Sequence, residues 1–259
     1  SVEGSCISIR KFSKKPMTLE RLMELESLSQ EVAEFLKLLV QAGYNIFISG
    51  GTGCGKTTFL NALSAYIPKT DRVITIEDSA ELQFQDVPNL VRLETRNANG
   101  QGAEEISIRD LIRTALRMRP DRIVVGEVRG AEAWDMFQAM NTGHDGSLST
   151  GHANSDRDML LRLETMMAMG EKVDFSVIQR QIVTGLDILI HLGRMRDRTR
   201  KVLQISELCG IKNGEIYLNT LYRFQETGVK GEKVHGIWKK ESSLQKRQKL
   251  EEKGLAYSG

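Results

Sequence analysis

The stretch GGTGCGKTTFLNAL, residues 50–63, constrains the fold of this chain more than any other. It matches the pattern G-x-x-x-x-G-K-[ST] at Gly50, Gly55, Lys56 and Thr57. In this pattern the glycines turn backbone N–H groups toward an anion at the N-terminus of a helix, where the helix dipole also favours negative charge. The stretch therefore predicts a strand, a phosphate-binding loop and a helix over residues 45–66.

The loop also indicates its ligand, because Lys56 is expected to reach the β- and γ-phosphates of a nucleotide and Thr57 to bind Mg²⁺. Kinases, GTPases and many motors share the pattern, so it does not decide the reaction by itself. The residues expected to bind the nucleotide are Gly51, Thr52, Gly53, Cys54, Gly55, Lys56, Thr57 and Thr58.

Strands and helices are expected to alternate around this loop. A buried-type strand is predicted over residues 44–49, and further strands over residues 72–78, 89–96, 121–130, 146–153, 187–195 and 200–210. Helices are predicted over residues 17–26, 31–43, 57–67, 106–120, 132–143, 158–170 and 176–186. Such alternation predicts an α/β fold with a mainly parallel sheet, flanking helices and an antiparallel extension.

The two ends of the chain differ from this core. Residues 1–18, with a short strand over 7–12, are expected to be the remnant of a preceding domain and its linker, and residues 19–225 form the core domain. The remainder is rich in Lys and Glu and nearly free of strand signal. Residues 226–259 are therefore expected to be a polar appendage, with a helix over 242–255.

Composition excludes several classes of protein. The 259 residues are 40% hydrophobic and 27% charged, which is the ordinary globular range. A net charge of +2 provides no overall basic field, so a nucleic-acid partner is disfavoured. No apolar run reaches ~18 residues, so direct membrane insertion is not expected. Cys6, Cys54 and Cys209 are an odd number at wide spacing, which favours a reducing, cytoplasmic compartment.

Two acidic stretches follow strand ends, where ligands of such folds bind. The first, IEDSAEL, holds Glu77, Asp78 and Glu81, and the second places Glu127 after the apolar run RIVVG. Either stretch alone could be a solvated loop. Both together after a phosphate loop favour a reaction in which one carboxylate orders a metal and another activates water. Glu77 and Glu127 are therefore expected to join Thr57 at the Mg²⁺ site.

The stretch GHDGSLSTGHANS holds His144 and His152, eight residues apart. Zinc would need further ligands at a recognisable spacing, so this metal is disfavoured. A histidine at the carboxyl end of a strand can instead donate to a γ-phosphate and report hydrolysis to the rest of the domain. His152, between Thr150 and Asn154, is the stronger candidate.

Arg109, Arg113 and Arg117 recur every four residues and lie on one face of the expected helix. Such a stripe is often a solvated face, and that interpretation stays open. The stripe also precedes the strand that leads to Glu127, and arginines of this kind reach a neighbouring subunit's γ-phosphate in ring-shaped NTPases.

Cys54 stands beside Lys56 at the start of a helix, a setting that favours the thiolate. A small residue tolerated in the loop is the simpler interpretation. The alternative predicts that ATP protects Cys54 from thiol reagents.

Four stretches in this order, GGTGCGKTT, ITIEDSAEL, LRMRPDRIVVGEVRG and GHDGSLSTGHANS, resemble the secretion-superfamily traffic ATPases. They are similar to that family's Walker A, Asp box, Walker B and His box, over roughly residues 5–225. The stretches LSTGHANS, IHLGRMRDRTRKVLQISEL and IYLNTLYRF are most similar to the CpaF/TadA branch, which drives tight-adherence pili. The type IV secretion ATPases, which also carry RMRPDRI, are the closest rivals.

The resemblance implies a RecA-like motor domain over residues 19–225 that binds ATP and Mg²⁺. It implies that Glu81 helps order the catalytic water, that Glu127 is the Walker B acid, and that His152 senses the state of the nucleotide. The tetracysteine zinc motif of the type II branch is missing.

The resemblance also extends to arginines and partners. Arg113 and Arg117 match arginines that act at a subunit boundary, and Arg10 is similar to one near the domain linker that approaches the nucleotide. A homo-hexamer is implied, cytoplasmic and docked on a platform protein at the inner face of the membrane. Its ATP hydrolysis would power pilus assembly or protein secretion.

Three alternatives stay open. One is a nucleotide-binding switch or scaffold with little turnover. Another is a RecA-type DNA translocase, which would need a groove of basic and stacking side chains. Aromatic residues are only 6% of the chain, and the clearest basic cluster is the turn Arg194–Lys201. A GTPase is least favoured, because no N-K-x-D motif is present in the sequence.

Overall fold

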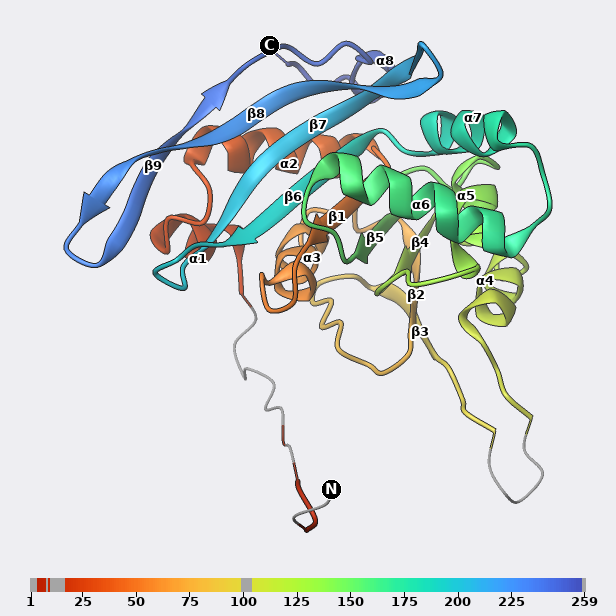
Figure 1. Ribbon diagram of the computed structural model, residues 1–259. Coiled ribbons are helices and arrows are strands. Elements are labelled where there is room, and N and C mark those ends of the chain that lie inside the picture. Colours follow the sequence, from red (N-terminus) through yellow and green to blue (C-terminus); the bar gives the residue numbers. More distant parts are fainter. Residues whose placement is uncertain (1–3, 8, 10–16, 99–103, 258–259) are drawn as a thin grey trace.

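The computed structural model describes residues 4–7, 9, 17–98 and 104–257. One nine-stranded sheet runs through this part of the chain, in the order β3-β2-β4-β5-β1-β6-β7-β8-β9. Figure 1 shows helices around one half of the sheet and long strands projecting beyond them in the other half. The strand expected over residues 7–12 falls largely, and Arg10 entirely, outside the described residues.

The sheet has a parallel half and an antiparallel half. The parallel half consists of β1 (Ile46–Gly50), β2 (Arg72–Glu77), β3 (Asn89–Glu94), β4 (Arg122–Val125), β5 (Leu148–Gly151) and β6 (Ile188–Arg194). The antiparallel half adds β7 (Arg200–Lys212), β8 (Glu215–Lys230) and β9 (Lys233–Lys240). The expected α/β fold, a mainly parallel sheet with an antiparallel extension, is confirmed.

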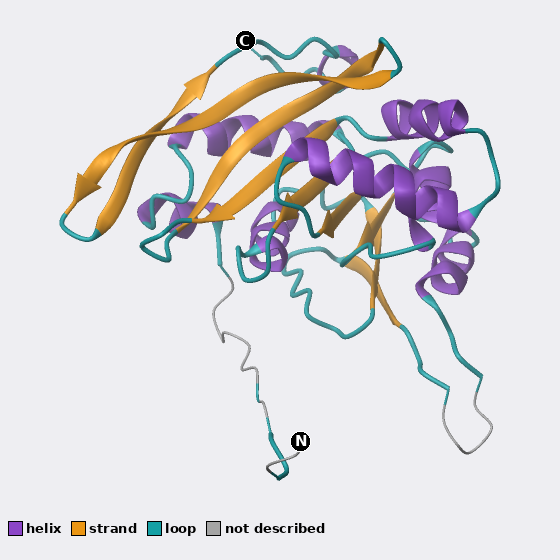
Figure 2. Ribbon diagram, in the orientation of Figure 1, coloured by secondary structure: helices purple, strands orange, loops and turns teal. Residues whose placement is uncertain are grey.

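Helices cover both faces of the parallel half (Figure 2). The first face packs against α1 (Leu19–Glu24), α2 (Gln30–Ala42), α3 (Lys56–Ser64) and the short α8 (Gln248–Glu252). The second face packs against α4 (Ile108–Leu116), α5 (Glu132–Met140), α6 (Asp156–Gly170) and α7 (Phe175–Gly185).

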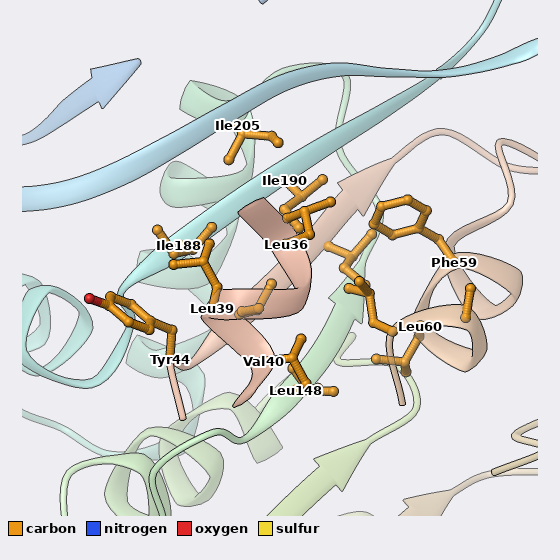
Figure 3. Close-up of a cluster of buried hydrophobic side chains, with 14 of the residues drawn as sticks. Leu36, Leu39, Val40, Tyr44, Phe59, Leu60, Leu148, Ile188, Ile190 and Ile205 are labelled. Carbon is orange, nitrogen blue, oxygen red and sulfur yellow. The ribbon is translucent and has the colours of Figure 1, made fainter. Parts of the chain in front are cut away.

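Successive side chains along each strand point to opposite faces of the sheet, which produces one hydrophobic core on each face. Ile46 and Ile48 point to the first face and Phe47 to the second, as expected for strands buried on both sides. Figure 3 shows the first core, where Leu36 and Leu39 of α2 lie close to Ile190 and Ile188 of β6. The apolar run of β1 is therefore fixed between two layers, and its carboxyl end is held in place.

Caps determine where the helices begin and end. Ser29 accepts a hydrogen bond from the Val32 N–H at the start of α2, and Gly43 ends this helix at a φ of 83°. Ser107 and Asp110 form a capping box at the start of α4, which fixes where this helix begins.

The expectation that strands end near residue 226 is wrong. β8 continues to Lys230, and β9 pairs with it in an antiparallel hairpin. Hairpin pairing satisfies the backbone, so β9 needs few apolar side chains; Trp238 supplies one, with its ring centroid 5.0 Å from that of Phe224. The division into residues 19–225 and 226–259 stays a prediction, although β8 crosses it.

Residues 241–257, which we term the C-terminal clasp, pack back onto the domain. Buried Glu207 accepts hydrogen bonds from the Gln245 and Lys246 N–H groups at 2.9 and 2.6 Å. Lys249 Nζ donates to the Gly43 carbonyl and to Asp187. The helix expected over 242–255 is confirmed only as the short α8. Throughout the described ranges, every helix is too short or too polar to cross a membrane.

Candidate active site

A cavity of 670 Å³ opens where β1, β2, β4 and β5 end, which is the edge of the sheet expected to bind ligands. The loop between β1 and α3 forms its floor. The cavity brings together eleven of the predicted site residues: Thr52, Gly53, Cys54, Gly55, Lys56, Thr57, Thr58, Glu77, Glu81, Glu127 and His152.

The loop lies against the backbone of β6. At Gly50 a Cβ atom would lie 2.4 Å from the Leu192 carbonyl oxygen, so only glycine permits this approach. Gly55 precedes α3 at a φ of 98°, in the left-handed region that favours glycine. The glycines of the motif thus serve one close backbone contact and one left-handed turn.

Lys56 is nearly buried and points into the loop. Its Nζ donates to the Gly50 and Gly51 carbonyls at 3.0 and 3.4 Å, and it lies 3.2 Å from Nδ1 of His152. An ammonium group carries only donors, so Nδ1 accepts. Burial lowers the pKa of Lys56, and burial followed by the Lys56 charge lowers the pKa of His152. The imidazole is therefore neutral near pH 7.

Glu127 follows β4 and meets His152 and Arg129. Nε2 of His152 lies 2.6 Å from Glu127 Oε1, and Arg129 donates to Oε2 at 2.6 Å. Arg129 also lies 3.7 Å from Asp78. Among the described residues Oε1 is buried without an aligned hydrogen bond, despite the close imidazole. Arg129 thus holds one oxygen of the expected Walker B acid, and the imidazole of His152 lies against the other.

Glu77 is buried at the end of β2 and holds the acidic loop that follows. Its Oε1 accepts hydrogen bonds from the Glu81 and Leu82 N–H groups at 3.0 and 2.8 Å, and burial raises its pKa. A Cβ at Gly126 would lie 3.0 Å from Glu77 Cγ. Gly126 therefore makes room for Glu77, which in turn holds the backbone beside Glu81. The place of Glu77 at the Mg²⁺ site stays a prediction.

The side chains present fit Mg²⁺. The Thr57 hydroxyl and the Glu127 carboxylate line the same cavity as Lys56, and Mg²⁺ prefers such oxygen ligands. Within the described ranges no three His, Cys, Asp or Glu side chains gather as a metal site. Mg²⁺ is commonly held by one or two carboxylates together with substrate phosphates, so this donor set suits it.

A family model for the type II/IV secretion system protein matches residues 1–233. The chain belongs to this family. The putative conjugal transfer protein Rv3659c of Mycobacterium tuberculosis is 38% identical over 208 residues, covering 80% of this chain and 58% of that protein. The type IV secretion system protein PtlH of Bordetella pertussis is 41% identical over 165 residues, covering 62% of this chain and 48% of PtlH.

A solved structure supports the same family. The VirB11 ATPase from the Brucella suis type IV secretion system, crystallised with sulphate, has a TM-score of 0.60 and 31% identity. The match covers 76% of this chain and 60% of VirB11. The chain thus spans about half to three fifths of the length of these relatives. The expected secretion-ATPase family is confirmed at the level of the superfamily.

Two arginines expected at the boundary between family subunits lie away from the cavity. Arg113 on α4 binds Asp135 of α5 at 2.9 Å, and Arg109 binds the other oxygen of Asp135 at 2.5 Å. Arg117 is exposed at the end of α4. The structure therefore does not bring Arg113 and Arg117 to this chain's own phosphate loop, and their role at a boundary stays a prediction.

Sequence reasoning missed two arginines of the site. Arg129 was not predicted as a site residue, although it follows Glu127 by two residues. Arg200 belongs to the basic turn that was weighed as a nucleic-acid site; its Nε instead donates to the Gly53 carbonyl at 2.9 Å. Nothing in the local sequence of Arg200 indicates this contact, because 147 residues separate the partners.

The structure contradicts the alternative interpretation of Cys54, in which the thiolate is favoured. Cys54 is only 3% exposed, and burial raises the pKa of its thiol although nearby Lys56 acts in the opposite direction. Its Sγ packs where a Cβ at Gly50 would lie. Cys54 therefore fills space under the loop, as the simpler interpretation held.

Proposed function

We propose that this chain is the motor core of a Mg²⁺-dependent ATPase that works as a hexamer. The observation that carries the proposal is the continuous set of contacts from Lys56 through His152 to Glu127. It joins the phosphate-binding group to the acid that acts on water. A loop that only bound phosphate would not need this link.

The residues divide the reaction among them. Lys56 moves from the Gly50 and Gly51 carbonyls to the phosphates of ATP, and Glu127 orients and deprotonates the attacking water. Arg129 holds Glu127 in place, and Glu81 faces the same space from the loop after β2. Mg²⁺ held by Thr57 and Glu127 would neutralise charge on the phosphate oxygens.

His152 is suited to sense the state of the nucleotide. Its two ring nitrogens face Lys56 and Glu127, one on each side. When a phosphate takes over Lys56, Nδ1 loses its donor and the imidazole can turn toward the γ-phosphate. The presence of that phosphate thereby changes the surroundings of Glu127.

The work done by the hexamer is protein secretion or pilus assembly through a platform protein at the inner face of the cell membrane. Within this proposal, the CpaF/TadA branch and the type IV secretion branch are two candidates. The likeness to PtlH and VirB11 favours type IV secretion. Neighbouring genes for pilins and a platform protein would favour the CpaF/TadA branch instead.

The experiment is steady-state ATP hydrolysis and binding of a fluorescent ATP analogue by the parent chain and Glu127→Gln. We expect turnover to fall at least about 100-fold with binding retained, because the amide cannot accept the water proton. Glu94→Gln, an exposed change at the end of β3, is the matched control and should hydrolyse ATP like the parent.

Two outcomes would redirect the proposal. Equal turnover in Glu127→Gln and the parent removes Glu127 from the reaction. Tight binding of ATP by a parent chain without Mg²⁺-dependent turnover, even at high protein concentration, would favour the nucleotide-binding switch or scaffold.

A further inference from the structure

The basic turn that joins β6 to β7, Arg194–Lys201, forms one wall of the cavity with its second half. Residues 198–201 line this wall. The turn is closed by hydrogen bonds from the Met195 N–H to the Thr199 carbonyl and from the Arg198 N–H to the Met195 carbonyl. Asp197 accepts from both the N–H and the hydroxyl of Thr199. The basic turn is therefore an ordered part of the site.

Arg200, the first residue of β7, reaches from this wall to the phosphate loop. Its Nε donates to the Gly53 carbonyl at 2.9 Å, and its Cδ would lie 3.2 Å from a Cβ at Gly55. The Cys54 N–H, in the same peptide plane as the Gly53 carbonyl, donates to the Gly51 carbonyl at 3.3 Å. The peptide group between Gly53 and Cys54 is thus held both at its carbonyl and at its N–H.

The turn is supported from behind by the β8–β9 hairpin. The second oxygen of Asp197 accepts a hydrogen bond from the Val234 N–H of β9 at 2.7 Å. Arg196 pairs with Glu226 of β8, with Nη1 at 2.7 Å from Oε2. The hairpin is in this way connected through Asp197 to Thr199, the residue directly before Arg200.

We infer that Arg200 is a positioning residue of the phosphate loop and that the hairpin holds it there through Asp197. The guanidinium has five N–H donors, and the contact with Gly53 uses only the one on Nε. Arg200 lines the cavity, so its remaining donors and its positive charge lie beside the space that nucleotide phosphates would fill. This role rests on the proposed function, because it requires the loop to bind a nucleotide.

ATP and ADP share the phosphates that the loop cradles, so both should depend on Arg200. We expect Arg200→Ala to raise the Kd for fluorescent analogues of ATP and ADP about tenfold. At saturating ATP, kcat should change less than about threefold, because Arg200 does not touch Glu127. Arg200→Lys keeps the positive charge but loses the planar set of N–H donors. Its Kd values for both analogues should therefore lie between those of the parent and those of Arg200→Ala.

Arg194→Ala is the matched control, since exposed Arg194 pairs with Arg200 across the two strands and is not among the described residues that line the cavity. It should bind both nucleotides within about twofold of the parent. Equal binding by Arg200→Ala and the parent would overturn the role of Arg200, as would an equal loss in Arg194→Ala. A parent chain that binds neither nucleotide would contradict the proposed function itself.

The bracing by the hairpin has its own test. Asp197→Ala should raise the Kd for ADP about threefold in the parent and leave it unchanged in the Arg200→Ala background, since coupled residues give non-additive losses. Asp197→Asn, which keeps one acceptor oxygen, should show a smaller effect. Fully additive losses would separate Asp197 from Arg200 and overturn the bracing. The melting temperature of each nucleotide-free variant confirms that it is folded.

Discussion

In the parallel half of the sheet, buried strands end at polar side chains that meet in one cavity. In the antiparallel half, buried polar side chains bind distant segments of the chain instead. Lys56 and Glu127 represent the first arrangement, and Glu207, which holds the C-terminal clasp, represents the second. The comparison teaches that one half presents chemical groups to a ligand, while the other half uses similar groups to hold the chain together.

The largest effect on stability is expected from Glu207→Ala. Glu207 is fully buried and accepts hydrogen bonds from two backbone N–H groups and from Asn219. Its loss leaves the two backbone N–H groups without a partner, so the free energy of unfolding should fall by about 3–5 kcal/mol. Urea denaturation followed by tryptophan fluorescence measures the change.

The control for this change is Glu241→Ala, which removes a partly exposed ion pair with Arg223. The Glu241→Ala change should lower the free energy of unfolding by less than about 1 kcal/mol. Similar losses from both variants would mean that the clasp contributes no more than a surface contact, and the contrast between the two halves would not hold.

A smaller, pH-dependent effect is expected at the junction of the halves. Asp156 begins α6 and accepts hydrogen bonds from Gln204 and Ser206 of β7. Burial raises its pKa from 3.8 to about 7, so the folded state holds the proton more tightly than the unfolded state. Its contribution to stability is complete below about pH 4 and is lost as the pH rises to about 7.

The Asp156→Asn variant cannot ionise at this position. Its free energy of unfolding relative to that of the parent should therefore increase by about 2–3 kcal/mol between pH 5 and pH 8. Unfolding free energies at the two pH values measure this gain. Asp158→Asn, an exposed change in the same helical turn, should show none. A difference between Asp156→Asn and the parent that does not vary with pH would contradict a buried, proton-binding Asp156.

The smallest effect is expected from Arg113→Ala. Arg113 is largely exposed, and Arg109 remains to pair with Asp135, so the loss of stability should be below about 1 kcal/mol. In dilute solution, ATP binding should stay within about twofold of the parent, because α4 lies away from the cavity. Weakened binding by a monomeric variant would show that α4 acts on the loop within one chain.

The features that could be read from the sequence are local or follow from sheet topology. The glycine spacing predicted the loop, and placing Glu77, Glu127 and His152 at strand ends predicted that they would meet. The contacts of Arg200 with Gly53 and of Glu207 with the clasp depend on how distant segments pack, which no local pattern encodes. β9 was missed for a related reason. Its backbone hydrogen bonds to β8 hold it in the sheet, so it needs few apolar side chains and its sequence carries little strand signal.

β6 is hydrogen-bonded to β1 on one side and to β7 on the other, so the phosphate loop and the projecting hairpin belong to one continuous sheet. The adjoining β8 has 16 residues and spans about 50 Å. Such a strand is a lever arm: a rotation of a few degrees at its base becomes a displacement of several ångström at its tip. The distance between spectroscopic labels at the β8–β9 turn and on α2, measured with and without nucleotide, tests whether such a displacement occurs.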